Sequence, residues 1–191
     1  MTKALVALHF QNDICHRDGL IPFAIDRASG APDAFLDRAR TAIARARAAG
    51  WLVVHVHIAF APDYSDMPRN ARLFLAAEKL GALSLGSWGA AAMQGFEPGP
   101  GDMLLVHRAN NAFHETGLED ALQAAGVREI AVMGLATQYS VEHTVRHAAD
   151  LGYAVTMLRD CCASANPAAA EASFAAMAML AEIRTLDEVA F

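Results

Sequence analysis

Three histidines and one serine stand at or near the ends of short apolar segments of the sequence. His9 follows ALVAL, His57 lies near the end of WLVVHVHI, His107 ends MLLVH, and Ser140 lies just beyond IAVMGL. Serine is a poor nucleophile at neutral pH and needs an adjacent base, and histidine is the most common one. If these residues meet in space, they predict acyl-transfer chemistry in which Ser140 attacks and His107 or His9 takes its proton.

The same residues have simpler structural interpretations. Ser140 would also suit the N-cap or first turn of a helix. A histidine in a strand is usually a packed and hydrogen-bonded residue. His57 together with His9 and His107 would also match the three-histidine ligand set of catalytic zinc. We keep that metal site as an alternative to our main expectation, which is a site with no metal and no cofactor.

Short apolar segments alternate with longer helical stretches along the chain. One helix shows the pattern well, because Leu36, Ala39, Ile43 and Ala46 share one face and Gly50 follows its end. The alternation predicts a three-layer (αβα) Rossmann-like fold with a six-stranded parallel sheet in a single α/β domain. The predicted strands are 4–9, 51–58, 103–107, 129–134, 153–158 and 182–184, and the predicted helices are 33–49, 72–80, 116–125, 140–151 and 167–180 in the single domain 1–191.

The carboxyl ends of parallel strands lie at one edge of a sheet, where such folds bind their ligands. His9, His107 and the turn before Ser140 all lie at predicted carboxyl ends. Their convergence favours neighbouring first, third and fourth strands, so we predict the strand order 2-1-3-4-5-6. The long, turn-rich segment 59–101 is expected to form a lid or an oligomer contact and to determine specificity.

The composition excludes several classes of protein. The 191 residues include 15 Lys and Arg against 21 Asp and Glu, and this net charge of −6 without basic runs argues against nucleic acid as a partner. No apolar stretch approaches the roughly 20 residues of a membrane-spanning helix. Cys15, Cys161 and Cys162 lack CxxC spacing, so we expect neither a disulfide framework nor a zinc site, and we predict a cytoplasmic location.

A family resemblance covers nearly the whole chain. We find similarity to the isochorismatase-like cysteine hydrolase superfamily, which includes nicotinamidases, carbamoyl-amide hydrolases and isochorismatases. It is carried by ALVALHFQND, VHRANNAFHETGLEDALQAAGV and IAVMGLATQYSVEHTVRHAADLGYAVTMLRDCCAS. The resemblance implies an αβα fold, a small-molecule substrate and assembly into homodimers or homotetramers.

The resemblance also implies where the catalytic residues should lie. The family uses an Asp, a Lys and a Cys, and its Q-x-D, N-A-F and G-x-x-T motifs place these three at His9, His107 and Ser140. All three positions depart from the family pattern, so thiol chemistry is not expected. The turn would supply an oxyanion hole from the backbone N–H groups of Ala136 and Ser140, next to a cis peptide bond between Leu135 and Ala136.

Several further residues are candidates for contact with a ligand. Arg108 and Asn111 follow the third predicted strand and would suit a carboxylate or an amide. Phe60 and Trp88 would cover the pocket, and Asp13 is interpreted as a structural residue of the turn after the first strand. The candidate substrate-binding residues are Gln11, Arg108, Asn111 and Tyr139.

Two classes of function follow from these residues. The first is a small-molecule hydrolase that cleaves an amide, carbamoyl or related acyl bond through Ser140 with His107 or His9 as base. In a variant of it, a histidine acid and a water hydrolyse an enol ether without a nucleophile. The alternative is a non-catalytic member of the family, a pseudoenzyme that binds a small ligand or serves as an oligomeric scaffold.

Overall fold

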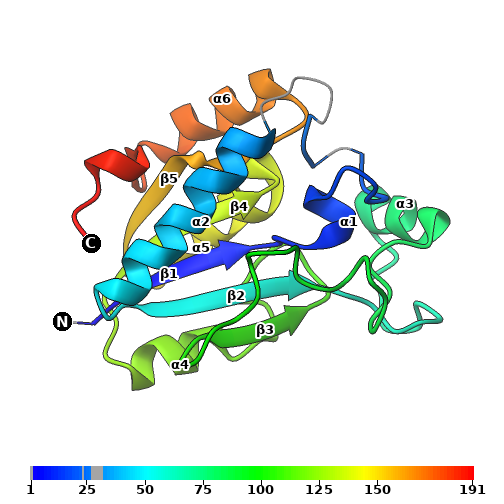
Figure 1. Ribbon diagram of the computed structural model, residues 1–191, viewed down its shortest axis with the longest axis horizontal. Coiled ribbons are helices and arrows are strands. Elements are labelled where there is room, and N and C mark those ends of the chain that lie inside the picture. The colour runs from blue at the N-terminus through cyan, green and yellow to red at the C-terminus, as the bar shows by residue number, and fades with distance from the viewer. Residues whose placement is uncertain (1, 23, 27–31) are drawn as a thin grey trace.

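The computed structural model describes residues 2–22, 24–26 and 32–191 and contains one parallel sheet (Figure 1). The strands pair in the order β3-β2-β1-β4-β5-β6, and all pairs are parallel. Their bounds lie within one residue of the predicted ones, except that β5 continues from the predicted end at 158 to Ala163. The strands are β1 (Lys3–Leu8), β2 (Leu52–Ile58), β3 (Met103–His107), β4 (Glu129–Leu135), β5 (Ala154–Ala163) and β6 (Glu182–Arg184).

Helices cover both faces of the sheet, which confirms the predicted α/β class with three layers. The helix α2 packs on one face, and α4, α5 and α6 contribute to the core on the other. A π-helical turn, Thr137–Val141, leads from β4 into α5. The α-helices are α1 (Asn12–Cys15), α2 (Pro32–Ala48), α3 (Arg72–Leu80), α4 (Leu118–Ala124), α5 (Glu142–Asp150) and α6 (Pro167–Met177).

The strand β1 shows why the central strands are apolar without interruption. Leu5 and Ala7 pack into the core beneath α2, whereas Ala4, Val6 and Leu8 pack into the core on the opposite face. Successive side chains of a strand point to opposite faces, so a strand covered on both sides must be apolar at every position. The same burial extends to the end of β1 and carries His9 to the edge of the sheet.

The predicted strand order is wrong. β2 lies between β1 and β3, so the strands that end near His9 and at His107 are not neighbours. Two spacings of about 4.8 Å separate such strands, and the two imidazole side chains bridge this gap across β2, since the His9 N–H donates to Val56 O and His107 pairs with Ile58. Convergence of side chains at the edge of a sheet therefore did not require adjacent strands.

None of the helices in the described ranges is long and apolar enough to cross a membrane. The helix α2 has the predicted apolar face, since Leu36, Ala39, Ile43 and Ala46 are all buried. It ends before Gly50, whose φ of 73° is a left-handed conformation that glycine adopts without steric cost.

Candidate active site

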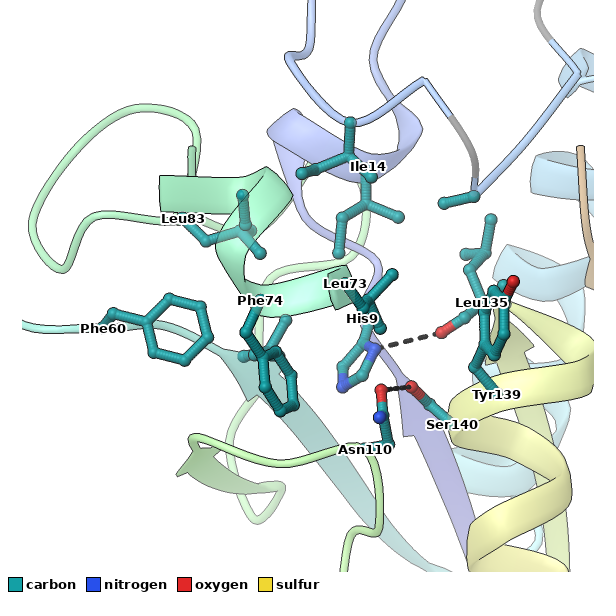
Figure 2. Close-up of a pocket in the computed structure, with 15 residues that line it drawn as sticks. His9, Ile14, Phe60, Leu73, Phe74, Leu83, Asn110, Leu135, Tyr139 and Ser140 are labelled. Atoms are coloured by element: carbon teal, nitrogen blue, oxygen red, sulfur yellow. Dashed lines mark hydrogen bonds between the residues drawn. The ribbon is translucent and has the colours of Figure 1, made fainter. Parts of the chain in front are cut away.

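A small cavity lies beyond the carboxyl ends of β1 and β4, where ligands bind in parallel sheets (Figure 2). Its volume is about 40 Å³. Three polar side chains line it, those of His9, Asn110 and Ser140, and Tyr139 and Ala136 lie beside them. The remaining wall is apolar. This cavity brings together two of the three residues predicted to do chemistry.

The backbone at the end of β1 turns so that His9 reaches the cavity. His9 has a φ of 63°, in the left-handed region where histidine is found more often than most residues, and its N–H donates to Val56 O at 2.8 Å. On the other side of β1, Gly134 has a φ of 133° and approaches Leu8 so closely that a Cβ there would lie 2.2 Å from the Leu8 carbonyl oxygen. Glycine is thus required where β4 passes the end of β1.

His9 and His107 contact each other directly. Their Nε2 atoms lie 2.7 Å apart, and both rings are buried. His9 Nδ1 faces Leu135 O at 3.0 Å, and His107 Nδ1 faces Asn111 O at 3.1 Å. Because a carbonyl oxygen only accepts hydrogen bonds, each Nδ1 carries a proton in this arrangement. A hydrogen bond between the two Nε2 atoms then needs one proton more than two neutral rings possess.

Burial keeps these histidines neutral. It lowers the pKa of His9 well below its ordinary value, and the neighbouring His107 and His57 lower it further. Burial likewise lowers the pKa of His107 to about 4, against a smaller opposing effect of the hydrogen bond to Asn111 O. Both imidazole rings are therefore neutral at neutral pH, and a general base must be neutral in order to accept a proton.

Ser140 sits in the π-helical turn and is 3% exposed. Its hydroxyl donates to Asn110 Oδ1 over a long 3.4 Å (Figure 2). Among the residues that the structure describes, no hydrogen bond joins Ser140 to His9 or His107. The peptide between Leu135 and Ala136 is cis, as the family resemblance implied. Ala136 and Ser140 both line the cavity, which is the placement that an oxyanion hole at this turn would need.

Tyr139 is the one candidate substrate-binding residue that lines the cavity. Gln11 does not, because its amide is used within the protein. It donates to Ile58 O and Ala90 O and accepts from Ile58 N, at 2.9, 2.7 and 2.8 Å. Gln11 therefore joins the end of β2 to the long segment that follows it, which is a structural role.

Arg108 and Asn111 are also engaged elsewhere. Arg108 Nε donates to Asp66 Oδ2 at 2.7 Å in an ion pair outside the cavity. The amide of Asn111 contacts His147 Nδ1 at 2.7 Å, and its Oδ1 accepts from Phe113 N. Neither side chain lines the cavity, so this arrangement does not place them in the expected contact with a ligand.

Asn110, which lies between Arg108 and Asn111 in the sequence, lines the cavity although the sequence did not single it out. It lines the cavity and accepts from Ser140, whereas its neighbours turn away. The only signal was its position after β3, which it shares with Arg108 and Asn111. The conformation of the loop decides which of the residues after β3 faces the cavity. A loop has no repeating pattern of apolar residues from which its conformation could be predicted.

Other predicted residues are placed as follows. Phe60 lines the cavity, whereas Trp88 is 54% exposed and packs edge-on against His16. Asp13 has the expected structural role, since its carboxylate accepts from Leu20 N and Leu83 N. Within the described ranges, no three His, Cys, Asp or Glu side chains are grouped to hold a metal, so His9, His57 and His107 do not form the alternative zinc site.

Comparisons with known proteins agree with this architecture. The family model described as Isochorismatase domain matches residues 3–188. A streptothricin hydrolase from Streptomyces noursei is 34% identical over 152 residues, which are 78% of this chain and 49% of that protein. A ureidoacrylate amidohydrolase, RutB, from Variovorax paradoxus (strain S110) is 31% identical over 170 residues, 83% of this chain and 67% of that protein. The chain thus spans about half the length of the first relative and two thirds of the second.

A solved structure gives the same result for the fold. The crystal structure of an isochorismatase family protein from Desulfovibrio vulgaris subsp. vulgaris str. Hildenborough superposes with a TM-score of 0.86 at 30% identity. The superposition covers 97% of this chain and 95% of that one. The likeness therefore includes the strands that border the cavity.

Proposed function

This chain belongs to the isochorismatase family, and we propose that it hydrolyses an amide, carbamoyl or related acyl bond of a small molecule through Ser140 and His9. The observation that carries the proposal is that the Ser140 hydroxyl and the His9 imidazole line one cavity at the carboxyl ends of the strands. The two named relatives above are both hydrolases, one of them an amidohydrolase. In this proposal His9, His107 and Ser140 occupy the positions of the family's Asp, Lys and Cys.

The first step forms a bond between Ser140 Oγ and the carbonyl carbon of the substrate. His9 Nε2 takes the hydroxyl proton as the bond forms, and the backbone N–H groups of Ala136 and Ser140 stabilise the oxyanion. His9 then returns the proton to the leaving nitrogen as the C–N bond breaks. A water, deprotonated by His9, hydrolyses the resulting ester and restores Ser140.

His107 acts on His9 and not on the substrate. When both rings are neutral, the two Nε2 lone pairs face each other at 2.7 Å and repel, which favours a turn of His9 towards Ser140. Once His9 has taken the proton, its Nε2–H can donate to His107 Nε2, which stabilises the imidazolium. His107 is thus a positioning residue that acts at Nε2, whereas Leu135 O faces Nδ1, the nitrogen that the Asp of a Ser–His–Asp triad holds.

A specific observation favours the alternative, a family member that binds a ligand without catalysis. Ser140 donates to Asn110, and both ring nitrogens of His9 are engaged by Leu135 O and His107. Catalysis therefore needs a rearrangement of His9, whereas ligand binding does not. In unliganded sites, catalytic hydrogen bonds often form only with substrate, so hydrolysis stays our first proposal.

Covalent labelling separates the two functions. We expect a fluorophosphonate or an acyl probe to add once to the wild-type protein at Ser140, detected by intact mass and peptide mapping. Ser140→Ala should abolish labelling, and His9→Gln should slow it at least tenfold, whereas Ser87→Ala, at a serine outside the cavity, should change nothing. A wild-type protein that binds amides but is never labelled or acylated would instead be the non-catalytic ligand binder.

A further inference from the structure

We propose that the cavity selects uncharged, short-chain aliphatic amides and rejects substrates that carry a carboxylate on the acyl chain. This inference names the substrate class of the proposed hydrolase and rests on that function. It follows from the chemistry of the cavity lining, which consists of an apolar wall and a polar floor formed by His9, Asn110 and Ser140.

The wall is built from aliphatic and aromatic side chains of separate segments. Ile14 comes from α1, Ile21 from the segment after it, Leu73 and Phe74 from α3, and Leu83 from the loop that follows α3 (Figure 2). No Lys, Arg, Asp or Glu is among the described residues that line the cavity. An alkyl group gains by leaving water for such a wall. A carboxylate would lose its hydration there and gain no cationic partner among the described lining residues.

The charged side chains nearby do not change this conclusion. Arg108, which the sequence suggested as a carboxylate ligand, is paired with Asp66 at 2.7 Å and lies outside the cavity lining. On the other side, the buried Asp13 accepts from the backbone of Leu20 and Leu83, and Leu83 is part of the wall.

The floor of the cavity is polar but neutral. Ser140, Asn110 and His9 provide a hydroxyl, a carboxamide and an imidazole, and burial lowers the pKa of His9 so that its ring is uncharged. These groups suit the carbonyl and NH₂ of an amide, which both donates and accepts hydrogen bonds. The amide head would therefore face Ser140, with the alkyl chain against Leu73 and Phe74.

The enclosed volume is small. A cavity of about 40 Å³ exceeds the roughly 10–15 Å³ that one water needs but is far smaller than the 150 Å³ cavity that holds a benzene. Because the cavity is also partly open to solvent, a short-chain amide can enter it without being enclosed on all sides.

A matched pair of ligands tests the inference. Isovaleramide and malonamate have the same shape, because an isopropyl group in the first is replaced by a carboxylate in the second. We expect ligand-observed NMR and calorimetry at pH 7.5 to show isovaleramide binding at least tenfold more tightly. Tighter or equal binding of malonamate, or no isovaleramide binding at all, would overturn the proposal.

The binding measurement is made on both the wild type and Ser140→Ala, so it does not depend on turnover. If labelling of Ser140 fails but the ligand preference holds, the proposed hydrolysis is wrong and the selectivity of the cavity stands. If labelling succeeds and malonamate binds better, the proposed selectivity of the cavity is wrong and the proposed hydrolysis stands.

Two leucines on α3 provide a matched pair of variants. Leu73 lines the cavity, whereas Leu75 is 40% exposed and does not. Leu73→Lys should narrow or reverse the preference for isovaleramide by introducing a cation, with at least a tenfold change in the ratio of the two affinities. Leu75→Lys should leave that ratio unchanged. An equal effect of both substitutions would show that the wall does not set the selectivity.

Discussion

The Nε2 atoms of His9 and His107 lie 2.7 Å apart although a complete strand, β2, separates the strands that carry them. Each ring is held from behind by a backbone carbonyl, Leu135 O for His9 and Asn111 O for His107. This places two basic nitrogens against each other in a buried site. The pair binds one proton between the rings more readily than two, because a second would put two buried positive charges in contact.

The pH dependence of hydrolysis should therefore be displaced to low pH. His9 must be neutral to act as a base, and burial holds its pKa well below the ordinary value of 6.5. Since a lowered pKa keeps the ring neutral at more acidic pH than an ordinary histidine, kcat/KM should stay level from about pH 8 to pH 6 and fall only below that range. A profile of kcat/KM with isovaleramide measures this. An acidic limb at or above pH 6.5 would exclude His9 as the base.

Acid should also destabilise the fold through His57. Its pKa is lowered to about 4, chiefly by burial and then by His55 and His107. Between pH 6.5 and 4, His57 binds a proton in the unfolded chain but stays neutral in the folded chain. The free energy of unfolding therefore falls as the pH falls. One such group accounts for about 2 kcal/mol at pH 5. Urea unfolding at pH 7.5 and pH 5 gives the difference.

The variant His57→Gln should recover part of this loss at pH 5. The exposed His143 is the matched control, because it lies on the surface of α5. His143→Gln should leave the acid destabilisation as in the wild type. Identical pH dependence in the wild type and His57→Gln would show that His57 is not the group that titrates.

Gly134→Ala should destabilise the protein strongly. The added Cβ would lie 2.2 Å from Leu8 O, and backbone atoms of two paired strands must move apart to admit it. We expect a loss of about 3 kcal/mol or more in the free energy of unfolding. Gly126→Ala is the control, because its φ of 67° is also left-handed but nothing lies near the new Cβ. That change should cost only about 1–2 kcal/mol, and an equal loss in both variants would contradict the clash.

Gln11→Ala should change stability and not ligand affinity. The substitution leaves the buried N–H and C=O of Ile58 and the C=O of Ala90 without the side-chain partner they now have. We expect a loss of about 2–4 kcal/mol in the free energy of unfolding. At a temperature where the variant is folded, its affinity for isovaleramide should match that of the wild type. An unchanged stability with weakened binding would make Gln11 a ligand contact after all.

The sequence by itself determined the layers of this protein and predicted where its candidate site lies. Leu36, Ala39, Ile43 and Ala46 predict α2 because a helical repeat brings them to one face, and Gly50 marks the end of the helix. The continuous apolar strands indicate a parallel sheet covered on both sides. The rule that ligands bind at the carboxyl ends of parallel strands then leads to His9, His107 and Ser140. These are consequences of short-range periodicity and chain direction.

Only the tertiary structure decided how these ends are arranged. The order of the strands, the contact of His9 with His107 and the pairing of Arg108 with Asp66 join residues that are distant in sequence. The turn after β3 brings Asn110, and not its neighbour Asn111, to the cavity. Such choices depend on the sum of many contacts across the fold and on loop conformation. A local pattern of residues predicts neither the long-range contacts nor the loop conformation, because the atoms concerned come together only when the chain folds.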